Sequence, residues 1–260
     1  MMNPINKSID KFLKRKKITS SILNNKGVSI IACTNLPHSL DNILDNFIRQ
    51  DVDTKELLII INNNKIDEVK WKNKTSKYDS IRVFKLNENI SLGRCLNFGV
   101  EKAKYDIISK FDDDDYYGPK YLSDTIKYFD CTEAKLIGKG ATFVYVVDKN
   151  ILTIRNPHEE NKYTNFVNGS TLTFKKGVFN MVRFQDKNIA EDVHFCRDCI
   201  RNGIKIYSCS KFHHVYFRSP SLNNHTWKIE DDEFLNLCCR QDLFNEPVES
   251  IDDIIKYVDI

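Results

Sequence analysis

The strongest constraint on this fold is the regular alternation of apolar runs with amphipathic stretches between Val28 and Phe129. Runs rich in β-branched residues are typical of strands that are buried on both faces of a parallel sheet. Read as four β-then-α units, this order predicts an α/β domain with a Rossmann-like, mostly parallel sheet flanked by helices. The four apolar runs lie at residues 28–33, 57–61, 81–86 and 105–111.

The pattern changes after Leu136, where short β-rich segments replace the alternation. Segments 142–147 and 151–154 flank Asp148-Lys149-Asn150 and predict a hairpin. A helix is expected at 190–201, ending at Asn202-Gly203. We therefore expect one domain over residues 28–227 with a small late β portion. Further strands are expected near 171–174, 204–207 and 214–217.

Both ends of the chain differ from this domain in charge. Residues 1–27 hold seven Lys/Arg and one acid, and we expect a basic, helical leader. Residues 228–260 form an acidic tail that we also expect to be helical. Two solvated ends are one interpretation, and contact of the leader with an anionic membrane or a partner is the other. Nucleic acid is not expected, because no aromatic or glycine pattern interleaves the lysines of the leader.

Composition favours an intracellular, water-soluble protein. The chain has no apolar stretch of transmembrane length and no signal-peptide core, which predicts a cytoplasmic location, with membrane association only through the leader. Eight cysteines in such a protein are expected to be reduced thiols. Cys33, Cys95 and Cys131 stand singly in apolar surroundings and are expected to be small core residues.

Four consecutive aspartates, Asp112 to Asp115, follow the fourth apolar run directly. Ligands of open parallel sheets bind beyond the carboxyl ends of the strands, where this run would lie. Four adjacent carboxylates repel one another unless a cation neutralises them. Mg²⁺ or Mn²⁺ prefers oxygen ligands and often bridges carboxylates to a substrate diphosphate. A solvated acidic loop is the alternative, but the run is followed at once by Tyr-Tyr-Gly-Pro and a predicted helix.

Five segments together resemble the family 2 glycosyltransferases, over roughly residues 28–227. The most specific parts are the aspartate run followed by Pro119 and the Glu191-Asp192 pair that opens a late helix. The resemblance implies the GT-A fold and transfer of a sugar from a nucleotide diphosphate with inversion at the anomeric carbon. The segments are VSIIACTN (28–35), ELLIIINNN (56–64), SLGRCLNFGVEKA (91–103), YDIISKFDDDDYYGPKYL (105–122) and AEDVHFCRDCIRNG (190–203).

The resemblance implies a donor site for a nucleotide-diphosphate sugar, with a UDP-sugar favoured. Thr34 and Asn35 occupy the segment that holds the base and ribose. Asn62 stands where the family usually has an aspartate that accepts a hydrogen bond from the base, and Arg94 stands where a basic residue often faces the donor. Arg94 is alternatively a surface helix residue.

The aspartate run matches the Asp-x-Asp motif of the family. The resemblance implies that Asp112, Asp114 and Asp115 hold the metal, with Asp115 most directly associated with it. Asp114 would also face the donor. Asp113 lies at the variable position and is expected to turn away, although it remains next to the donor-binding residues. His225, in His225-Thr226-Trp227, would add a late imidazole to the metal; a structural role is the alternative.

The acceptor side is implied by two later segments. Asp192 matches the catalytic base of the family and Glu191 its acidic neighbour; acids at a helix N-terminus also occur for purely structural reasons. Asn168, Gly169 and Ser170 resemble the loop that lines the acceptor site, where a carbohydrate or another hydroxyl acceptor would bind. They are alternatively a simple turn.

Three other interpretations compete with this one. A zinc site could use Cys196-x-x-Cys199, but both cysteines fall inside a predicted helix. A nucleotidyltransferase would normally carry a glycine- and lysine-rich loop after the first strand, and Thr34-Asn35-Leu36-Pro37 is not one. A non-catalytic sugar-nucleotide-binding or scaffold protein would keep the fold without turnover. The other zinc-type residues considered are His194, Cys209, His213 and His214.

Overall fold

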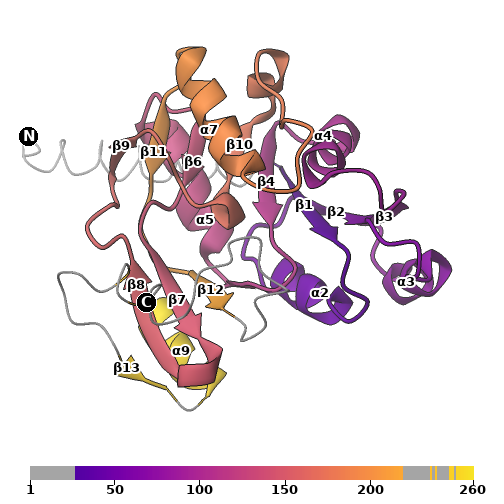
Figure 1. Cartoon of the computed structure of the whole chain (residues 1–260), viewed down its shortest axis with the longest axis horizontal. Coiled ribbons are helices and arrows are strands. Elements are labelled where there is room, and N and C mark those ends of the chain that lie inside the picture. Colours follow the sequence, from indigo (N-terminus) through magenta and orange to yellow (C-terminus); the bar gives the residue numbers. More distant parts are fainter. Residues whose placement is uncertain (1–26, 219–234, 236–237, 239–245, 249) are drawn as a thin grey trace, which may run out of the picture.

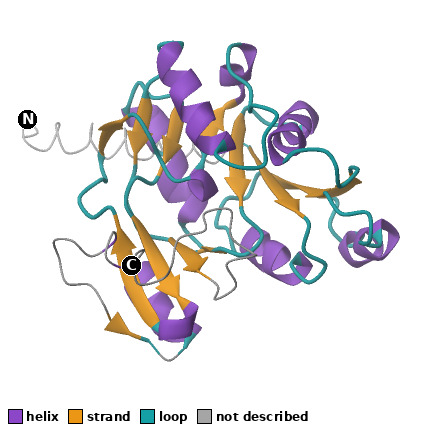
Figure 2. Cartoon of the chain, in the orientation of Figure 1, coloured by secondary structure: helices purple, strands orange, loops and turns teal. Residues whose placement is uncertain are grey.

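The computed structural model of the chain describes residues 27–218, 235, 238, 246–248 and 250–260. Two sheets organise these residues, and helices cover both faces of the larger one (Figures 1 and 2). The larger sheet has the order β3-β2-β1-β4-β10-β6-β11-β9, and the smaller has the order β13-β8-β7-β12-β5.

Four parallel strands form the first half of the larger sheet. They are β1 (Val28–Thr34), β2 (Lys55–Ile61), β3 (Ile81–Lys85) and β4 (Ile107–Phe111), and they confirm the predicted β-then-α alternation. The helices that follow are α2 (Leu40–Ile48), α3 (Glu68–Thr75), α4 (Leu92–Lys102) and α5 (Tyr121–Ile126), with α6 (Tyr128–Cys131) behind. Helix α3 has no counterpart in the predicted elements, because only its Trp71 and Thr75 are buried and its apolar pattern is correspondingly weak.

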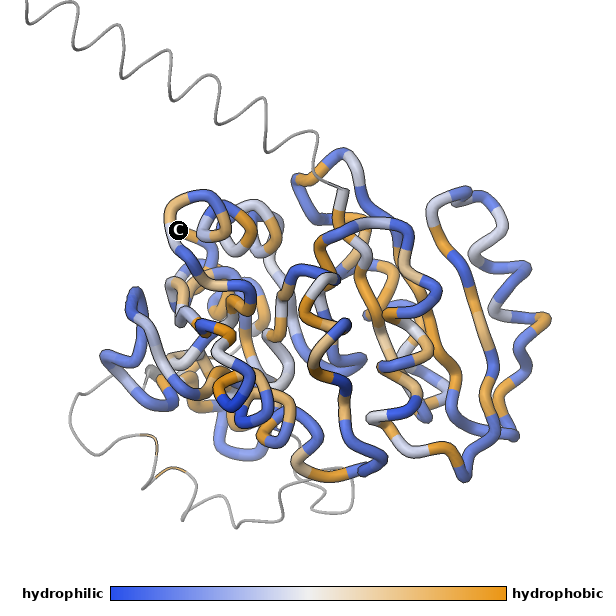
Figure 3. Tube along the Cα trace, turned by 90° about the horizontal axis from the view of Figure 1, so that it is seen from above, coloured by the Kyte–Doolittle hydropathy of each residue, from blue (hydrophilic) through white to orange (hydrophobic). Residues whose placement is uncertain are grey.

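Alternate residues of the parallel strands enter two separate cores. Ile30 packs with Leu44 of α2 and Tyr121 of α5 on one face, whereas Ile31 packs with Leu96 of α4 on the other. Both isoleucines are essentially inaccessible to water, and burial of each stabilises the fold by about 1.5–3 kcal/mol. Continuous apolar runs are therefore what a sheet covered on both faces requires. Figure 3 shows how hydrophobic and hydrophilic residues alternate along the chain trace.

The second half of the larger sheet breaks the parallel order. Strand β10 (Thr173–Lys175) runs antiparallel to β4, with Thr173 opposite Ser109. This direction brings the residues before β10 to the carboxyl end of β4. Beyond β10 lie β6 (Leu136–Gly138), β11 (Ile206–Ser208) and β9 (Lys162–Thr164), and α7 (Glu191–Arg201) packs on the α4 side.

The smaller sheet contains the predicted hairpin and the predicted late strand. Strands β7 (Thr142–Val146) and β8 (Ile151–Arg155) are antiparallel, and β12 (His214–Arg218) pairs with β7. Strand β5 (Tyr116–Tyr117) follows the aspartate run at once and joins the edge of this sheet. The aspartate run therefore connects β4 of the larger sheet to β5 at the edge of the smaller sheet.

The described part of the expected acidic, helical tail contains a helix and a short strand, and both elements lie against the smaller sheet. Strand β13 (Glu246–Pro247) pairs with β8, and α9 (Ile251–Val258) buries Ile254 and Val258 against the smaller sheet. Apolar residues spaced along α9 outweigh its acidic character. The basic leader lies outside the described residues except for Gly27, and residues 219–227 at the predicted domain end also lie outside them.

None of the helices in the described part of the chain combines the length and apolar character that a membrane crossing requires. Cys95 is buried in the α4 core as predicted, and Cys33 is half-buried. The prediction for Cys131 is wrong, because this residue ends the short helix α6 at the surface and is exposed.

Candidate active site

The aspartate run begins where β4 ends, at the carboxyl edge of the parallel strands. Two asparagines of α2, one turn apart, hold its main chain. Asn42 Nδ2 donates to the Asp113 and Asp115 carbonyls at 2.9 and 3.1 Å, and Asn46 Nδ2 donates to the Asp115 carbonyl at 2.8 Å. Helix α2, which follows β1, therefore holds the aspartate run in place through these main-chain contacts.

Asp112 is paired with a buried cation, Lys110. The ammonium of Lys110 bonds Asp112 Oδ1, and only 6% of the Lys110 side chain is exposed. Burial lowers the pKa of Lys110, but Asp112, Glu191 and Asp192 raise it more, so the ammonium stays charged. Lys110 therefore links the aspartate run electrostatically to the start of α7.

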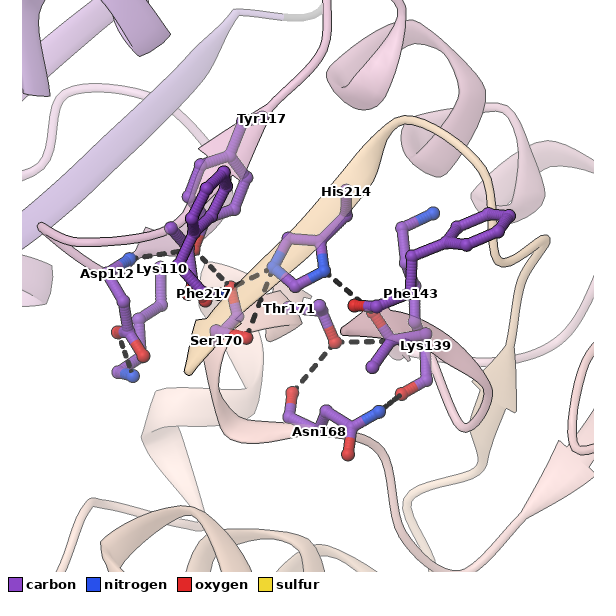
Figure 4. Close-up of polar contacts among 12 residues, drawn as sticks. Lys110, Asp112, Tyr117, Lys139, Phe143, Asn168, Ser170, Thr171, His214 and Phe217 are labelled. Atoms are coloured by element: carbon purple, nitrogen blue, oxygen red, sulfur yellow. Dashed lines mark hydrogen bonds and ion pairs between the residues drawn. The ribbon is translucent and has the colours of Figure 1, made fainter. Parts of the chain in front are cut away.

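Asp115 points into the protein interior (Figure 4 shows the surrounding network). Its Oδ1 accepts a hydrogen bond from Phe217 N at 3.1 Å, and its Oδ2 lies 3.3 Å from His214 Nε2. Burial raises the pKa of Asp115 well above its usual range. This position does not suit the expected role of Asp115 as the residue most directly associated with metal, because its oxygens face β12 instead of solvent.

Asp113 and Asp114 lie nearer the surface, and Asp114 alone of the four is exposed. Burial raises the pKa of Asp113 to about 6, while a hydrogen bond with Thr34 acts in the opposite direction. Although Asp114 as a residue is exposed, the surrounding protein desolvates its carboxyl group, and this desolvation, followed by repulsion from Asp115, Asp113 and Asp112, raises the pKa of Asp114 to about 9. Asp113 faces Thr34, one of the predicted donor-binding residues, and its expected orientation away from the metal stays a prediction.

The predicted donor residues lie along the same edge but are engaged with one another. The buried Thr34 hydroxyl accepts from Leu36 N at 3.0 Å and contacts Ser39 Oγ at 2.8 Å. Asn35 is exposed. Asn62 N donates to the Thr34 carbonyl at 2.7 Å, and Asn62 Nδ2 donates to the Asn87 carbonyl at 2.7 Å. With its amide nitrogen engaged there, Asn62 keeps its amide oxygen as an acceptor.

Arg94 lies apart from this group in the described structure. It is largely exposed on α4, and its guanidinium is 3.8 Å from Asp186, an equally exposed carboxylate. Exposed pairs of this kind stabilise a fold by about 0–1 kcal/mol, so the contact would not prevent a phosphate from competing for Arg94.

The predicted acceptor loop and the predicted base are in contact. Gly169 lies so close to Asp192 that a Cβ at Gly169 would fall 2.3 Å from Asp192 Oδ2. Asn168 is fixed by its Nδ2, which donates to the Lys139 carbonyl at 2.7 Å, and Ser170 contacts His214. The loop is therefore a single turn of 3₁₀ helix, Gly169–Thr171, that is held on both sides.

Glu191 and Asp192 begin α7, after Ala190 with a left-handed φ of 60°. Glu191 is buried, and burial raises its pKa to about 7 although the nearby Lys110 acts against this. Asp192 is half-buried, and its Oδ1 accepts from Val193 N at 2.8 Å. Its other oxygen faces Gly169, so Asp192 presents a carboxylate at the loop while Glu191 lies behind it.

Several residues of this site were not found from the sequence. Lys110 occupies a strand position that pattern analysis treats as an ordinary interruption of an apolar run. Asn42 and Asn46 could have been found from their spacing. Two amide side chains one helical turn apart lie on the same face of a helix and can bind the same partner. His214 was considered only as a zinc ligand, and Tyr117 only as part of the sequence that follows the aspartates.

The zinc alternative is not supported. Cys196 and Cys199 are buried within α7, and His194 lies near the surface beside Lys187 and Arg197. Over the described part of the chain, no three His, Cys, Asp or Glu side chains converge as a metal cage would require. His225 lies outside that part.

The aspartate run nevertheless has the chemistry that a divalent cation shared with a diphosphate requires. Such a cation needs only one or two protein carboxylates, because substrate phosphates and water complete its coordination. Asp112 and Asp114 offer hard oxygen donors at the strand end. Desolvation and then mutual repulsion raise the pKa of Asp114, and a cation would relieve the repulsion. The residues present therefore fit Mg²⁺ or Mn²⁺.

Comparison with known proteins defines the class of protein and then the family. Solved structures that superpose on this chain have the GT-A fold, an α/β fold of glycosyltransferases. S. aureus TarS 1–349 in complex with UDP-GlcNAc gives a TM-score of 0.61 at 14% identity, over 82% of this chain and 64% of that one. Mannosyltransferase PcManGT from Pyrobaculum calidifontis, in complex with GDP-Man and Mn²⁺, gives 0.55 at 14% identity, over 75% and 57%. At these identities the likeness establishes the fold.

The sequence comparison is more specific. Residues 29–189 match the profile of Glycosyl transferase family 2, and the chain belongs to this family. The O-antigen biosynthesis glycosyltransferase WbnJ of Escherichia coli is 29% identical over 146 residues, which are 54% of this chain and 57% of that protein. The chain thus spans less than two thirds of the length of this relative.

Proposed function

We propose that this chain transfers a sugar from a nucleotide-diphosphate donor to an acceptor hydroxyl, with inversion at the anomeric carbon. One observation carries the proposal. The aspartate run and the start of α7 lie within electrostatic range of the same buried ammonium, Lys110, and Gly169 lies against Asp192. A donor-side carboxylate cluster and an acceptor-side carboxylate therefore share one surface, as displacement from the side opposite the leaving group requires.

In this proposal Asp192 is the general base. Its carboxylate would take the proton of the attacking hydroxyl, which the Asn168–Ser170 loop would hold beside it. Glu191 is the poorer candidate for this role, because it is buried and its pKa is raised to about 7, so that it is partly protonated near neutral pH. It would instead support the position of α7 through its attraction to Lys110.

Asp112 and Asp114 would hold a divalent cation, and Asp115 would fix the loop from inside. The cation, when bound, would stabilise the negative charge that develops on the departing nucleotide diphosphate. Asp113, through Thr34, would connect the run to the base- and ribose-binding segment at the end of β1. Thr34, Asn35 and Asn62 would line that segment, and Arg94 would approach the diphosphate.

A UDP-sugar is the favoured donor, and a carbohydrate is the favoured acceptor. The amide oxygen of Asn62 can accept from the N3–H of uracil without adding charge. The TarS structure holds UDP-GlcNAc, whereas the mannosyltransferase holds GDP-Man, so the base needs a direct test. The O-antigen function of the Escherichia coli relative supports a role in polysaccharide biosynthesis.

The test is a panel of UDP-, GDP- and dTDP-sugars with Mn²⁺ or Mg²⁺, followed by release of the nucleoside diphosphate. Acceptor-dependent release and a product of inverted anomeric configuration by NMR would support the proposal. A donor that binds in a thermal-shift titration but is never turned over with any acceptor would favour the non-catalytic binding protein instead. Retention of configuration would exclude Asp192 as the base of a single displacement.

A further inference from the structure

Three amide side chains, spaced four residues apart, bond the main chain of the segment that leaves β4. Asn42 and Asn46 lie on α2, and Gln50 comes just after its last turn. Residues four apart in a helix lie one turn apart on the same face. We call these three residues the amide ladder, and their partners follow one another along the chain from Asp113 to Leu122.

The first two residues of the ladder hold the aspartate run. Asn42 Nδ2 donates to the Asp113 and Asp115 carbonyls, which lie on either side of the exposed Asp114. Asn46 Nδ2 donates to the Asp115 carbonyl, and its Oδ1 accepts from Tyr117 N at 3.0 Å. Because carbonyls only accept and main-chain N–H groups only donate, these partners fix the orientation of both amides.

The third residue of the ladder holds the chain beyond the run. Gln50 Nε2 donates to the Tyr117 and Gly118 carbonyls at 3.2 and 3.0 Å. Gln50 Oε1 accepts from Leu122 N at 3.1 Å, in the first turn of α5. Gln50 therefore stabilises β5 and the start of α5, whereas Asn42 bonds the run itself.

Helix α2 also begins at the predicted base- and ribose-binding segment. The Thr34 hydroxyl accepts from Leu36 N and lies 2.8 Å from Ser39 Oγ, and the Ser39 carbonyl accepts from Ile43 N at 3.0 Å. Hydrogen bonds thus close the turn between β1 and α2. One helix therefore connects the nucleotide segment at its N-terminal end to the aspartate run along its side.

The chemistry of the ladder suits a site for a divalent cation. Amides carry no charge, so the ladder adds none to a run whose four carboxylates repel one another. A lysine or arginine at the same positions would neutralise part of the run and compete with the cation. A main chain that is already fixed also spares binding the conformational entropy of ordering it.

We infer that Asn42 and Asn46 are positioning residues that hold the main chain of the aspartate run in register with the base- and ribose-binding segment. A cation on the run would then meet the diphosphate of a nucleotide on that segment. The inference rests on the proposed function for its ligands, but the arrangement of the run can be tested without them.

The first test is hydrogen exchange of the metal-free protein. Asn42 is half-buried and alanine is the best helix former, so α2 should persist in Asn42→Ala. Exchange in the peptide that covers residues 112–117 should become roughly three- to tenfold faster, the effect of losing one or two hydrogen bonds. Two protected amides report on this peptide, Asp112 N on the Tyr117 hydroxyl and Tyr117 N on Asn46.

Asn97→Ala is the matched control for exchange. Asn97 is a half-buried amide of α4 that bonds Phe184 N and the Phe184 carbonyl at 3.0 and 2.9 Å. Exchange should rise around Phe184 in this variant and stay unchanged at residues 112–117. Unchanged exchange at residues 112–117 in Asn42→Ala would overturn the inference, whatever the protein binds.

The second test separates positioning from stability by calorimetric titration of two probes. Asn42→Ala should raise the Kd of UDP in the presence of Mn²⁺ by roughly three- to tenfold. The Kd of uridine, which has no phosphate, should stay within roughly twofold, because the nucleotide segment keeps its own hydrogen bonds. Gln50→Ala should lower the urea midpoint more than Asn42→Ala does and change the Kd of UDP less. If Gln50→Ala does not fold, Asn97→Ala takes its place in the affinity comparison.

Equal losses of UDP and uridine binding in Asn42→Ala would contradict the inference, and so would a UDP affinity that follows the urea midpoint across the variants. If the wild-type protein binds none of UDP, GDP and dTDP with Mn²⁺, the proposed function fails. The exchange experiment would still decide whether Asn42 holds the run.

Discussion

The main chain of Gly169 lies directly against the Asp192 carboxylate, at a distance that leaves no room for a side chain. A methyl group there would fall 2.3 Å from Asp192 Oδ2. We expect Gly169→Ala to lower kcat by roughly 10–10²-fold, because it displaces the proposed base. Gly177→Ala is the matched control, since nothing lies within 4 Å of an added Cβ there. Steady-state kinetics of both variants make the comparison, and equal activities would show that Asp192 can move without consequence.

Asp192→Asn tests the base directly. The amide keeps the shape of the carboxylate and can still accept from Val193 N, so the fold and donor binding should persist. Turnover should fall by roughly 10²–10⁴-fold, the usual effect of losing a general base. Asp198→Asn, on the same helix but bonded to Gln185, is the control. Near-normal turnover of Asp192→Asn with unchanged donor affinity would remove Asp192 from the mechanism.

Glu191→Gln should change the pH dependence of stability. Burial raises the folded-state pKa of Glu191 from 4.5 to about 7, so the native state binds the proton more tightly than the unfolded chain does. The contribution of Glu191 to the free energy of unfolding is therefore at its maximum below pH 4.5. It decreases as the pH rises toward 7, by at most about 3 kcal/mol in total. The Gln variant cannot ionise, so urea unfolding in the presence of chelator should show it more stable than wild type at about pH 8 and equal to it at about pH 4.5. A constant difference at both pH values would show that the Glu191 proton is not involved.

Metal dependence should reside in the exposed part of the aspartate run. We expect activity to vanish in excess chelator and Asp114→Asn to raise the Mn²⁺ concentration required, because one hard oxygen ligand is lost. If His225, which lies outside the described residues, also binds the metal, His225→Ala should weaken the Mn²⁺ response more than the Mg²⁺ response, since nitrogen ligands favour transition metals. Metal titration at saturating donor measures both. Full activity in chelator would contradict the metal assignment.

Asp259 should be more important for stability than its place near the end of the chain suggests. It accepts from the Tyr116 hydroxyl at 2.6 Å and faces His213 Nδ1 at 3.0 Å. Asp259→Ala leaves both groups without this partner in a nearly buried place, which should lower the free energy of unfolding by about 1–3 kcal/mol. Asp252→Ala, in the exposed first turn of α9, should change it by less than about 1 kcal/mol. Equal losses in urea denaturation would refute the special role of Asp259.

The first half of the fold was predictable because its information is local. A strand with a continuous apolar run, such as Leu57 to Ile61, is stable only when both of its faces are covered. The apolar residues at helical spacing between the runs predict the helices that cover them. The order of the later strands was not predictable, since β10 is three residues long and enters the sheet beside β4 against the direction of its neighbours. No pattern in so short a strand specifies a partner as distant as Ser109, which is 64 positions from Thr173.

The site was predictable where residue type and position alone imply chemistry. The aspartates after β4 and the acids at the start of α7 belong to this group. The role of Asp115 was not predictable, because adjacent aspartates are equivalent in sequence until the chain turns and directs one of them inward. Burial of Lys110 and His214 also depends on tertiary packing, and charged or polar residues are usually expected at the surface.

Residues that contact one another in the site are far apart in sequence, and this determines when the site can form during protein synthesis. Asp115 and its partner Phe217 are 102 residues apart, and Tyr116 and Asp259 are 143 residues apart. At about 5–20 residues per second of synthesis, Asp115 waits roughly 5–20 s for Phe217 to be made. The parallel strands, whose pairings are closer in sequence, can assemble during this interval. A nascent chain halted after α7 would therefore hold the four parallel strands, while Asp115 would still lack the β12 partners, Phe217 and His214, that hold it inward.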